Sequence, residues 1–209
     1  VILNWPDQGL IFDVAVHVGS LLAVMIYFRH EILTMTAAWF GSVFKKQHNQ
    51  DSRLAWWVIL GTIPAVLAGL VFKDIIETEM RSPLVIAWAT IAFGILLGLA
   101  DRVKHKARSE YGMTVKDVLV VGFFQALALI PGTSRSGITI TAGLFLGLTR
   151  EAAARFSFLL SIPIILASGL FKTKELIESE IPIEVSLLLL AVFLSAISAW
   201  ACIHLFLQM

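Results

Sequence analysis

The chain has 209 residues, a formal net charge of +1 at pH 7 and 58% hydrophobic residues, and only 15% of its residues are charged. Soluble domains carry about 25% charged residues, so the composition argues against a water-soluble domain, and the small net charge gives no basic surface for nucleic acid. With a mean hydropathy of +0.85, the sequence predicts an all-α polytopic membrane protein that forms a single membrane domain over residues 1–209.

Five apolar stretches are predicted to be transmembrane helices, because crossing a bilayer core takes about 20 helical residues. In chain order they are residues 8–28, 54–72, 83–100, 156–171 and 185–209, the fourth being extendable through residues 152–154. Residues 31–44 combine Trp39, Phe40 and Phe44 with polar positions and predict one amphipathic helix at the membrane interface.

The first span contains two polar residues, Asp13 and His17. They are four residues apart and therefore share a helix face. Ionisable residues inside a membrane usually indicate function, so both are candidate accessory site residues. In the alternative interpretation, Asp13 caps the helix at the interface and His17 is its buried hydrogen-bonding partner.

The loops differ in charge. Residues 45–53 and 101–117 are basic, whereas residues 73–81 and 172–184 are acidic. Because basic loops remain in the cytoplasm, we expect the first pair inside and the second pair outside. Counting the spans then requires residues 118–149 to enter and leave the membrane on the cytoplasmic side, in agreement with Arg150 and Arg155 at their end.

Residues 118–149 consist of two short apolar runs separated by the polar stretch PGTSRSG, residues 131–137. Neither run is long enough to cross a bilayer, so the segment predicts one re-entrant helical hairpin. Irregular backbone at membrane depth must be buried in protein or line a wet cavity, and broken helices of this kind mark substrate sites.

The polar loop has the chemistry of a phosphate-binding site. Arg135 offers a planar fork that binds phosphate oxygens in pairs, and Gly137 is predicted to open a helix whose N-terminus favours an anion. Backbone freedom and hydroxyl donors come from the other loop residues, Gly132, Thr133, Ser134 and Ser136. The alternative is a turn that only joins two helices, with a serine as N-cap, but four polar side chains between apolar runs are costly without a purpose.

The segment QALALIPGTSRSG, residues 125–137, closely resembles the second signature of the undecaprenyl-diphosphate phosphatases of the bacitracin-resistance type. Two further stretches agree: Phe12 and Asp13 followed by GSLLA at residues 19–23, and AARFSFLLSIP at residues 153–163. The resemblance covers nearly the whole chain, and its PGTSRSG block is the specific part. It implies part of an inverted-repeat architecture, with Arg135 and Ser134 as catalytic residues and Gln125, Gly132, Thr133, Ser136 and Gly137 binding substrate.

The resemblance also implies a reaction. Such enzymes hydrolyse undecaprenyl diphosphate to undecaprenyl phosphate and inorganic phosphate in the bacterial cytoplasmic (inner) membrane. This recycles the lipid carrier for peptidoglycan synthesis, cell-wall biogenesis and cell shape, and confers bacitracin resistance. A divalent cation, Mg or Ca, is expected, although its ligands are not identifiable in the sequence. The expected partners are the polyprenyl diphosphate and membrane lipid, and the resemblance leaves a homodimer open.

The family's first signature, two glutamates four apart followed by Ser-Ser-Thr-Gly-His, is not found upstream of Phe12, and the family has a further C-terminal span. We therefore expect the acid/base residues to lie outside residues 1–209 and this segment alone to be inactive. The alternative function is a secondary transporter or flippase for a phosphate-bearing or polyprenyl-phosphate substrate, because broken helices and inverted repeats also build transporters. Phosphate release discriminates between the two.

Overall fold

A computed structural model describes residues 9–72, 75–76, 80, 82–103, 107–177 and 185–208. These residues form eight α-helices and one 3₁₀ helix. Within this part of the chain the only strand-like pairing is an isolated bridge between Arg108 and Leu148. The all-α class predicted from the sequence is confirmed.

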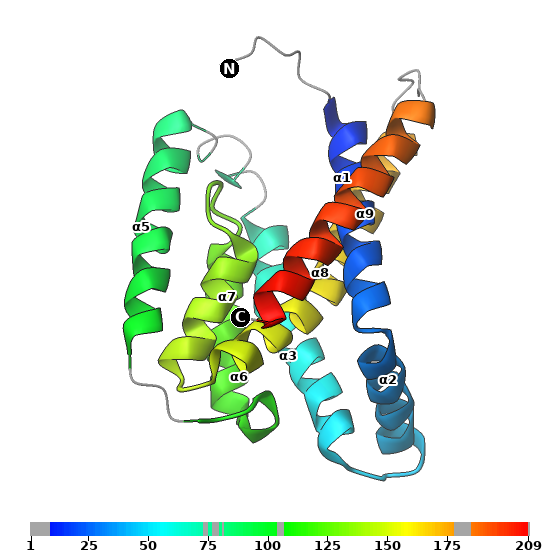
Figure 1. Ribbon diagram of the computed structural model, residues 1–209, viewed down its shortest axis with the longest axis vertical. Coiled ribbons are helices and arrows are strands. Elements are labelled where there is room, and N and C mark those ends of the chain that lie inside the picture. The colour runs from blue at the N-terminus through cyan, green and yellow to red at the C-terminus, as the bar shows by residue number, and fades with distance from the viewer. Residues whose placement is uncertain are drawn as a thin grey trace. The chain divides into compact units, whose positions relative to one another are not determined.

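The helices fall into two compact units. The first unit comprises residues 1–29 and 165–209, and in it α1 (Gly9–Tyr27) packs along α9 (Val185–Gln208), as Figure 1 shows. The two backbones approach closely at Gly19, where an added Cβ would lie 2.3 Å from the Val192 carbonyl oxygen. Near the other end of this contact, the rings of Trp200 and His204 stack with their centroids 5.2 Å apart.

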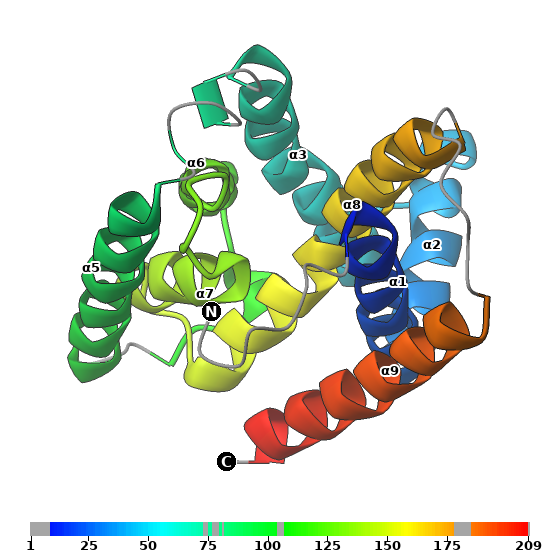
Figure 2. The same ribbon diagram turned by 90° about the horizontal axis from the view of Figure 1, so that it is seen from above.

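The second unit, residues 30–164, contains the polar loop. Its helices are α2 (Arg29–Phe44), α3 (Gln50–Val71), α5 (Pro83–Arg102), η1 (Glu110–Gly112), α6 (Val115–Leu127), α7 (Arg135–Phe145) and the first part of α8 (Arg150–Ile177). Helix α6 packs against α3, and α7 packs against both α5 and α6; Figures 1 and 2 both show α5, α6 and α7 side by side. The predicted hairpin is therefore a pair of half-length helices packed against α3 and α5.

Side-chain caps explain where several of these helices begin. Asn49 and Ser52 form a reciprocal capping box at α3, and Thr114 and Asp117 form another at α6. At the start of α8, the Thr149 hydroxyl accepts a hydrogen bond from the Ala152 amide at 3.1 Å. Each such cap contributes about 1 kcal/mol by satisfying amides that the first helical turn leaves unpaired.

Among the described residues, three helices are long and apolar enough to cross a membrane: α3, α5 and the stretch Ser186–Leu205 of α9. A fourth span is possible if α1 and α2 together form one broken span. These helices support a multi-pass membrane protein with three to four spans, whereas the sequence predicts five, and the five-span count stays a prediction. The structure divides into two units, so the single membrane domain over residues 1–209 also stays a prediction.

Some predicted boundaries were wrong. Helix α8 continues to Ile177, so residues 172–177 are helical although they were assigned to a loop. Lysine, glutamate and leucine are good helix formers, and a change from apolar to charged residues ends a membrane span without ending a helix. Similarly, α3 begins at Gln50 inside the predicted 45–53 loop. Residues 73–74, 77–79, 81 and 178–184 of the two acidic loops lie outside the described part of the chain.

Candidate active site

The polar loop is seated on α5 through Gly132. This residue has a φ of +90°, a backbone conformation that side chains with a Cβ rarely adopt. Its carbonyl oxygen accepts a hydrogen bond from the Thr90 hydroxyl at 2.9 Å, and an added Cβ would lie 2.4 Å from the Ile86 carbonyl oxygen. The glycine is thus required both by its conformation and by the close approach of α5.

Helix α7 begins at Arg135, two residues before the predicted start at Gly137. Its N-cap is Ser134, whose hydroxyl accepts a hydrogen bond from the Gly137 amide at 3.2 Å and lies 3.4 Å from the Ser136 hydroxyl. The expectation that the helix opens at Gly137 was therefore wrong. A side-chain oxygen that satisfies an N3 amide starts a helix, and Ser134 is the residue with that spacing from Gly137.

Two polar atoms of the loop are buried without a partner. The Arg135 Nη1 and the Thr133 Oγ1 are inaccessible to solvent, and no residue in the described part of the chain forms a hydrogen bond with either. Such atoms are rare in native structures because leaving them unpaired costs free energy. Both are donors next to the N-terminus of α7, where the helix dipole favours negative charge. The loop therefore has unused donors suited to an anion.

The other predicted site residues differ in their surroundings. Gln125 is buried in α6 and its Nε2 donates to the Gly61 carbonyl of α3 at 3.4 Å, so its observed role is helix packing, while its Oε1 is buried without a described partner. His17 is exposed on α1, in the other compact unit, and the side chain of Asp13 lies outside the described residues. Substrate binding by Gln125 and accessory roles for Asp13 and His17 stay predictions.

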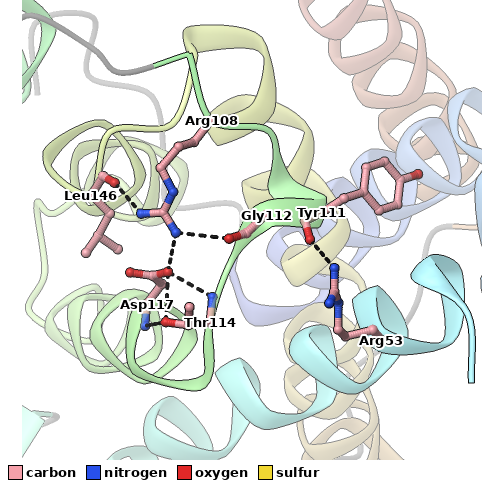
Figure 3. Close-up of polar contacts among 7 residues, drawn as sticks. All are labelled: Arg53, Arg108, Tyr111, Gly112, Thr114, Asp117 and Leu146. Atoms are coloured by element: carbon pink, nitrogen blue, oxygen red, sulfur yellow. Dashed lines mark hydrogen bonds and ion pairs between the residues drawn. The ribbon is translucent and has the colours of Figure 1, made fainter.

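In the sequence Arg108 is one basic residue of the loop 101–117, but in the structure it makes three specific contacts. As Figure 3 shows, its guanidinium donates to the Leu146 carbonyl at 2.8 Å, the Gly112 carbonyl at 3.0 Å and the Asp117 carboxylate at 2.7 Å. Leu146 caps the C-terminus of α7 and Asp117 lies in the first turn of α6. Arg108 therefore connects the C-terminal end of α7 to the first turn of α6.

Asp117 is held ionised in this arrangement. Burial by itself would raise the pKa of its carboxyl group, but hydrogen bonds from Arg108 and Thr114 outweigh burial and lower the pKa below the ordinary value. Both the amide and the hydroxyl of Thr114 donate to the same carboxylate oxygen, at 2.8 and 2.9 Å. The carboxylate therefore serves the capping box of α6 and the Arg108 pair together.

Further basic residues of the predicted cytoplasmic side form contacts between elements. Arg150 binds Asp101 at the end of α5 with two hydrogen bonds, of 2.6 and 3.0 Å. Arg155 lies 3.7 Å from Glu31 and 3.5 Å from the buried Glu110. In Figure 3, Arg53 of α3 donates to the backbone carbonyl of Tyr111 in η1. These contacts fix the ends of α3, α5 and α8 around the hairpin.

No pattern in the sequence distinguishes Thr90 or Arg108 as part of this site. Thr90 and Arg108 donate to backbone carbonyls 42 and 38 residues away in the chain, respectively. Because every residue carries a carbonyl, the sequence does not identify which residue will be the acceptor. The available signals were a threonine inside an apolar span and an arginine close to an aspartate at a helix start.

The resemblance implies a divalent cation, which would need ligands among the side chains around the loop. None of their His, Cys, Asp and Glu side chains form a group of three or more that could hold a metal ion. The loop itself offers hydroxyl and guanidinium donors rather than carboxylates, whereas Mg²⁺ and Ca²⁺ prefer carboxylate and carbonyl oxygens. These residues therefore do not fit a protein-only metal site, and no chemical step is assigned to a metal.

Known proteins resemble this chain over its whole length. A family model described as bacitracin resistance protein BacA matches residues 1–209. A curated protein named undecaprenyl-diphosphatase 2, from Stutzerimonas stutzeri (strain A1501), is 59% identical over 212 residues. That match covers 100% of this chain and 78% of the relative. The similarity thus extends through both compact units and includes the polar loop.

Proposed function

Because the chain belongs to the bacitracin resistance protein BacA family, we propose that it hydrolyses undecaprenyl diphosphate to undecaprenyl phosphate and inorganic phosphate. The reaction regenerates the lipid carrier of peptidoglycan precursors, and bacitracin resistance is the property by which the family is described. The substrate follows from the name of the curated relative at 59% identity, and the polar loop offers chemistry that suits it.

One observation carries the proposal: the buried Arg135 Nη1 and Thr133 Oγ1 have no described partner. Both lie next to the cap of α7, where Ser134 and Ser136 place their hydroxyls 3.4 Å apart. Leaving each donor buried and unused costs about 1–3 kcal/mol, and this cost favours a site in which an acceptor binds. A diphosphate supplies several acceptor oxygens and would satisfy them.

In the proposed reaction, water attacks the terminal phosphorus, the P–O bond to the bridging oxygen breaks, and the lipid monophosphate leaves. Arg135 binds non-bridging oxygens and stabilises the charge that develops on them. Thr133 and Ser136 donate hydrogen bonds, and the α7 dipole adds favourable potential. Ser134 is proposed as the second catalytic residue at the cap. The group that accepts the proton of the water is not assigned to a described residue.

The first test replaces Arg135 with lysine in the protein encoded by the complete gene. We expect the rate to fall by roughly 10²–10³, because an ammonium keeps the charge but not the paired hydrogen bonds. The measurement is phosphate release from undecaprenyl diphosphate in detergent. The control is Arg150→Lys, since Arg150 pairs with Asp101 outside the loop and its side chain is 70% exposed. Near-normal turnover of Arg135→Lys would remove Arg135 from the site.

The same assay decides between hydrolysis and the transport alternative. A transporter or flippase with this loop would bind the diphosphate head group but release no phosphate. Phosphate release by purified protein that is abolished in Arg135→Lys supports hydrolysis. Lipid movement in vesicles without phosphate release would instead establish the transporter.

We further propose a multi-pass protein of the cytoplasmic (inner) membrane with five spans, one interfacial helix and a re-entrant hairpin at residues 118–149, forming part of an inverted repeat. The charge of the loops supports the orientation, with residues 45–53 and 101–117 inside. A cysteine at Ser179 should react with an impermeant reagent from outside, and one at Ser109 should not, after Cys202 is replaced. The reverse labelling would overturn the orientation. A homodimer and a Mg or Ca cofactor remain part of the proposal.

A further inference from the structure

A short chain of buried hydroxyl groups lies behind the first turn of α7. The Oγ1 of Thr139 and the Oγ of Ser157 are 2.7 Å apart, and the two residues are 2% and 1% exposed. Thr139 lies one turn after Arg135 on α7, whereas Ser157 belongs to α8. The pair is therefore a direct polar connection between the loop-bearing helix and its neighbour.

The hydrogens of these two groups can be accounted for. Thr139 Oγ1 lies 3.0 Å from the Arg135 carbonyl oxygen and 3.1 Å from the Ser136 carbonyl oxygen, so its hydroxyl donates to that turn. Thr139 then accepts the hydrogen of Ser157, whose Oγ also lies 3.5 Å from the Ser136 carbonyl oxygen. In the reverse order Thr139 donates to Ser157, and Ser157 donates to the Ser136 carbonyl. In both orders the chain therefore ends on a carbonyl group of the first turn of α7.

This connection affects the direction in which the Arg135 side chain points. The Nη1 of that side chain has no partner among the described residues, so its direction depends on its stem and on the backbone from which it extends. A reactive group needs support that holds it within about 0.5 Å and 10–20° of its working geometry. The hydroxyl pair supports this backbone directly, because Thr139 bonds to the carbonyl of Arg135 itself.

We infer that Ser157 is a positioning residue for the reaction: through Thr139 it fixes the first turn of α7 and so the direction of Arg135 toward the phosphate. The inference rests on the proposed function. Ser157 lies in α8, after the hairpin. In this role it supports Arg135 and does not itself touch the substrate.

Helix α8 supplies a matched control. Ser161 lies one turn after Ser157 and is also 1% exposed, but its hydroxyl donates to the Phe158 carbonyl of its own helix. Both Ser→Ala changes remove one buried hydroxyl from the same helix. Only the change at Ser157 removes a bond to α7, so a difference between the two variants reports on that bond.

The experiment measures phosphate release from undecaprenyl diphosphate and its inhibition by inorganic phosphate, in the protein encoded by the complete gene. For Ser157→Ala we expect kcat/KM to fall about three- to tenfold, the range for losing one hydrogen bond, and the inhibition constant of phosphate to rise. Ser161→Ala should change neither. General loss of folded protein would lower the rate but leave the phosphate inhibition constant unchanged, so that outcome would refute positioning.

A double variant completes the test. If Ser157 acts through Arg135, Ser157→Ala should cost little further activity in the Arg135→Lys background, because contacts that act as a unit are not additive. An undiminished further loss in that background would refute the inference. The two proposals fail differently: a wild-type protein that releases no phosphate overturns the function, whereas an active wild type with an equally active Ser157→Ala variant overturns only the positioning role.

Discussion

Replacing Gly132 with alanine tests the seating of the loop on α5. The φ of +90° is unfavourable for any residue with a Cβ, by about 1–2 kcal/mol. The new methyl group would also lie 2.4 Å from the carbonyl oxygen and 2.9 Å from the Cα of Ile86, both backbone atoms of α5. Since real Cβ atoms do not approach so closely, the loop or the helix must move.

The size of the effect follows from these two terms. Strain from overpacking typically costs about 1–3 kcal/mol, so together with the backbone term we expect the free energy of unfolding to fall by about 2–5 kcal/mol. Movement of the loop would also lengthen the 2.9 Å bond from Thr90 to Gly132. A displacement of about 1 Å at a reacting group costs on the order of 10²-fold in rate, so activity should fall even where the protein remains folded.

The assay combines thermal unfolding in detergent with phosphate release at a temperature where both variants are folded. The matched control is Gly94→Ala on α5, where an added Cβ meets nothing within 4 Å and helix propensity favours alanine by roughly 0.5–1 kcal/mol. We expect Gly94→Ala to be active and at least as stable as the wild type. Wild-type stability and turnover in Gly132→Ala would refute the reasoning, as would equal damage from both variants.

Three further predictions concern the site and its support. Ser134→Ala should reduce kcat more than Ser136→Ala and cost about 1 kcal/mol of stability, because Ser134 caps α7; equal or reversed effects on kcat would reject its catalytic assignment. The lowered pKa of Asp117 means that its contribution is complete above the ordinary aspartate pKa of about 3.9 and is lost as the pH falls through the lowered folded value. The wild type should therefore have a higher Tm than Asp117→Asn, by a difference that is constant from pH 7 to about 5 and shrinks in stronger acid. A difference in Tm that stays constant down to pH 2 would contradict this assignment. Because the family resemblance implies a divalent cation, treatment with EDTA should abolish phosphate release and added Mg or Ca should restore it, whereas full activity in EDTA would exclude the divalent cation.

The sequence by itself determined the features that depend on local chemistry. Long apolar runs predicted α3, α5 and α9, because hydrophobicity and helix length are properties of consecutive residues. The loop PGTSRSG predicted an anion site between two half-length helices, because Arg135 and its polar neighbours are adjacent in the chain. The sequence did not determine the helix ends: α7 begins at Arg135, two residues before the predicted Gly137, and α8 continues to Ile177. A cap or a favourable helix propensity can override a change in polarity.

The tertiary structure alone decided what holds the loop in place. Thr90 donates a hydrogen bond to the Gly132 carbonyl, and Arg108 donates one to the Leu146 carbonyl at the end of α7. Ser157 of α8 bonds to Thr139 of α7. Each of these contacts joins residues 18 to 42 positions apart, and most end on backbone carbonyl groups. A side chain that bonds to a carbonyl places no demand on the identity of its partner, so these contacts exist only once the packing of the helices has brought the two groups together.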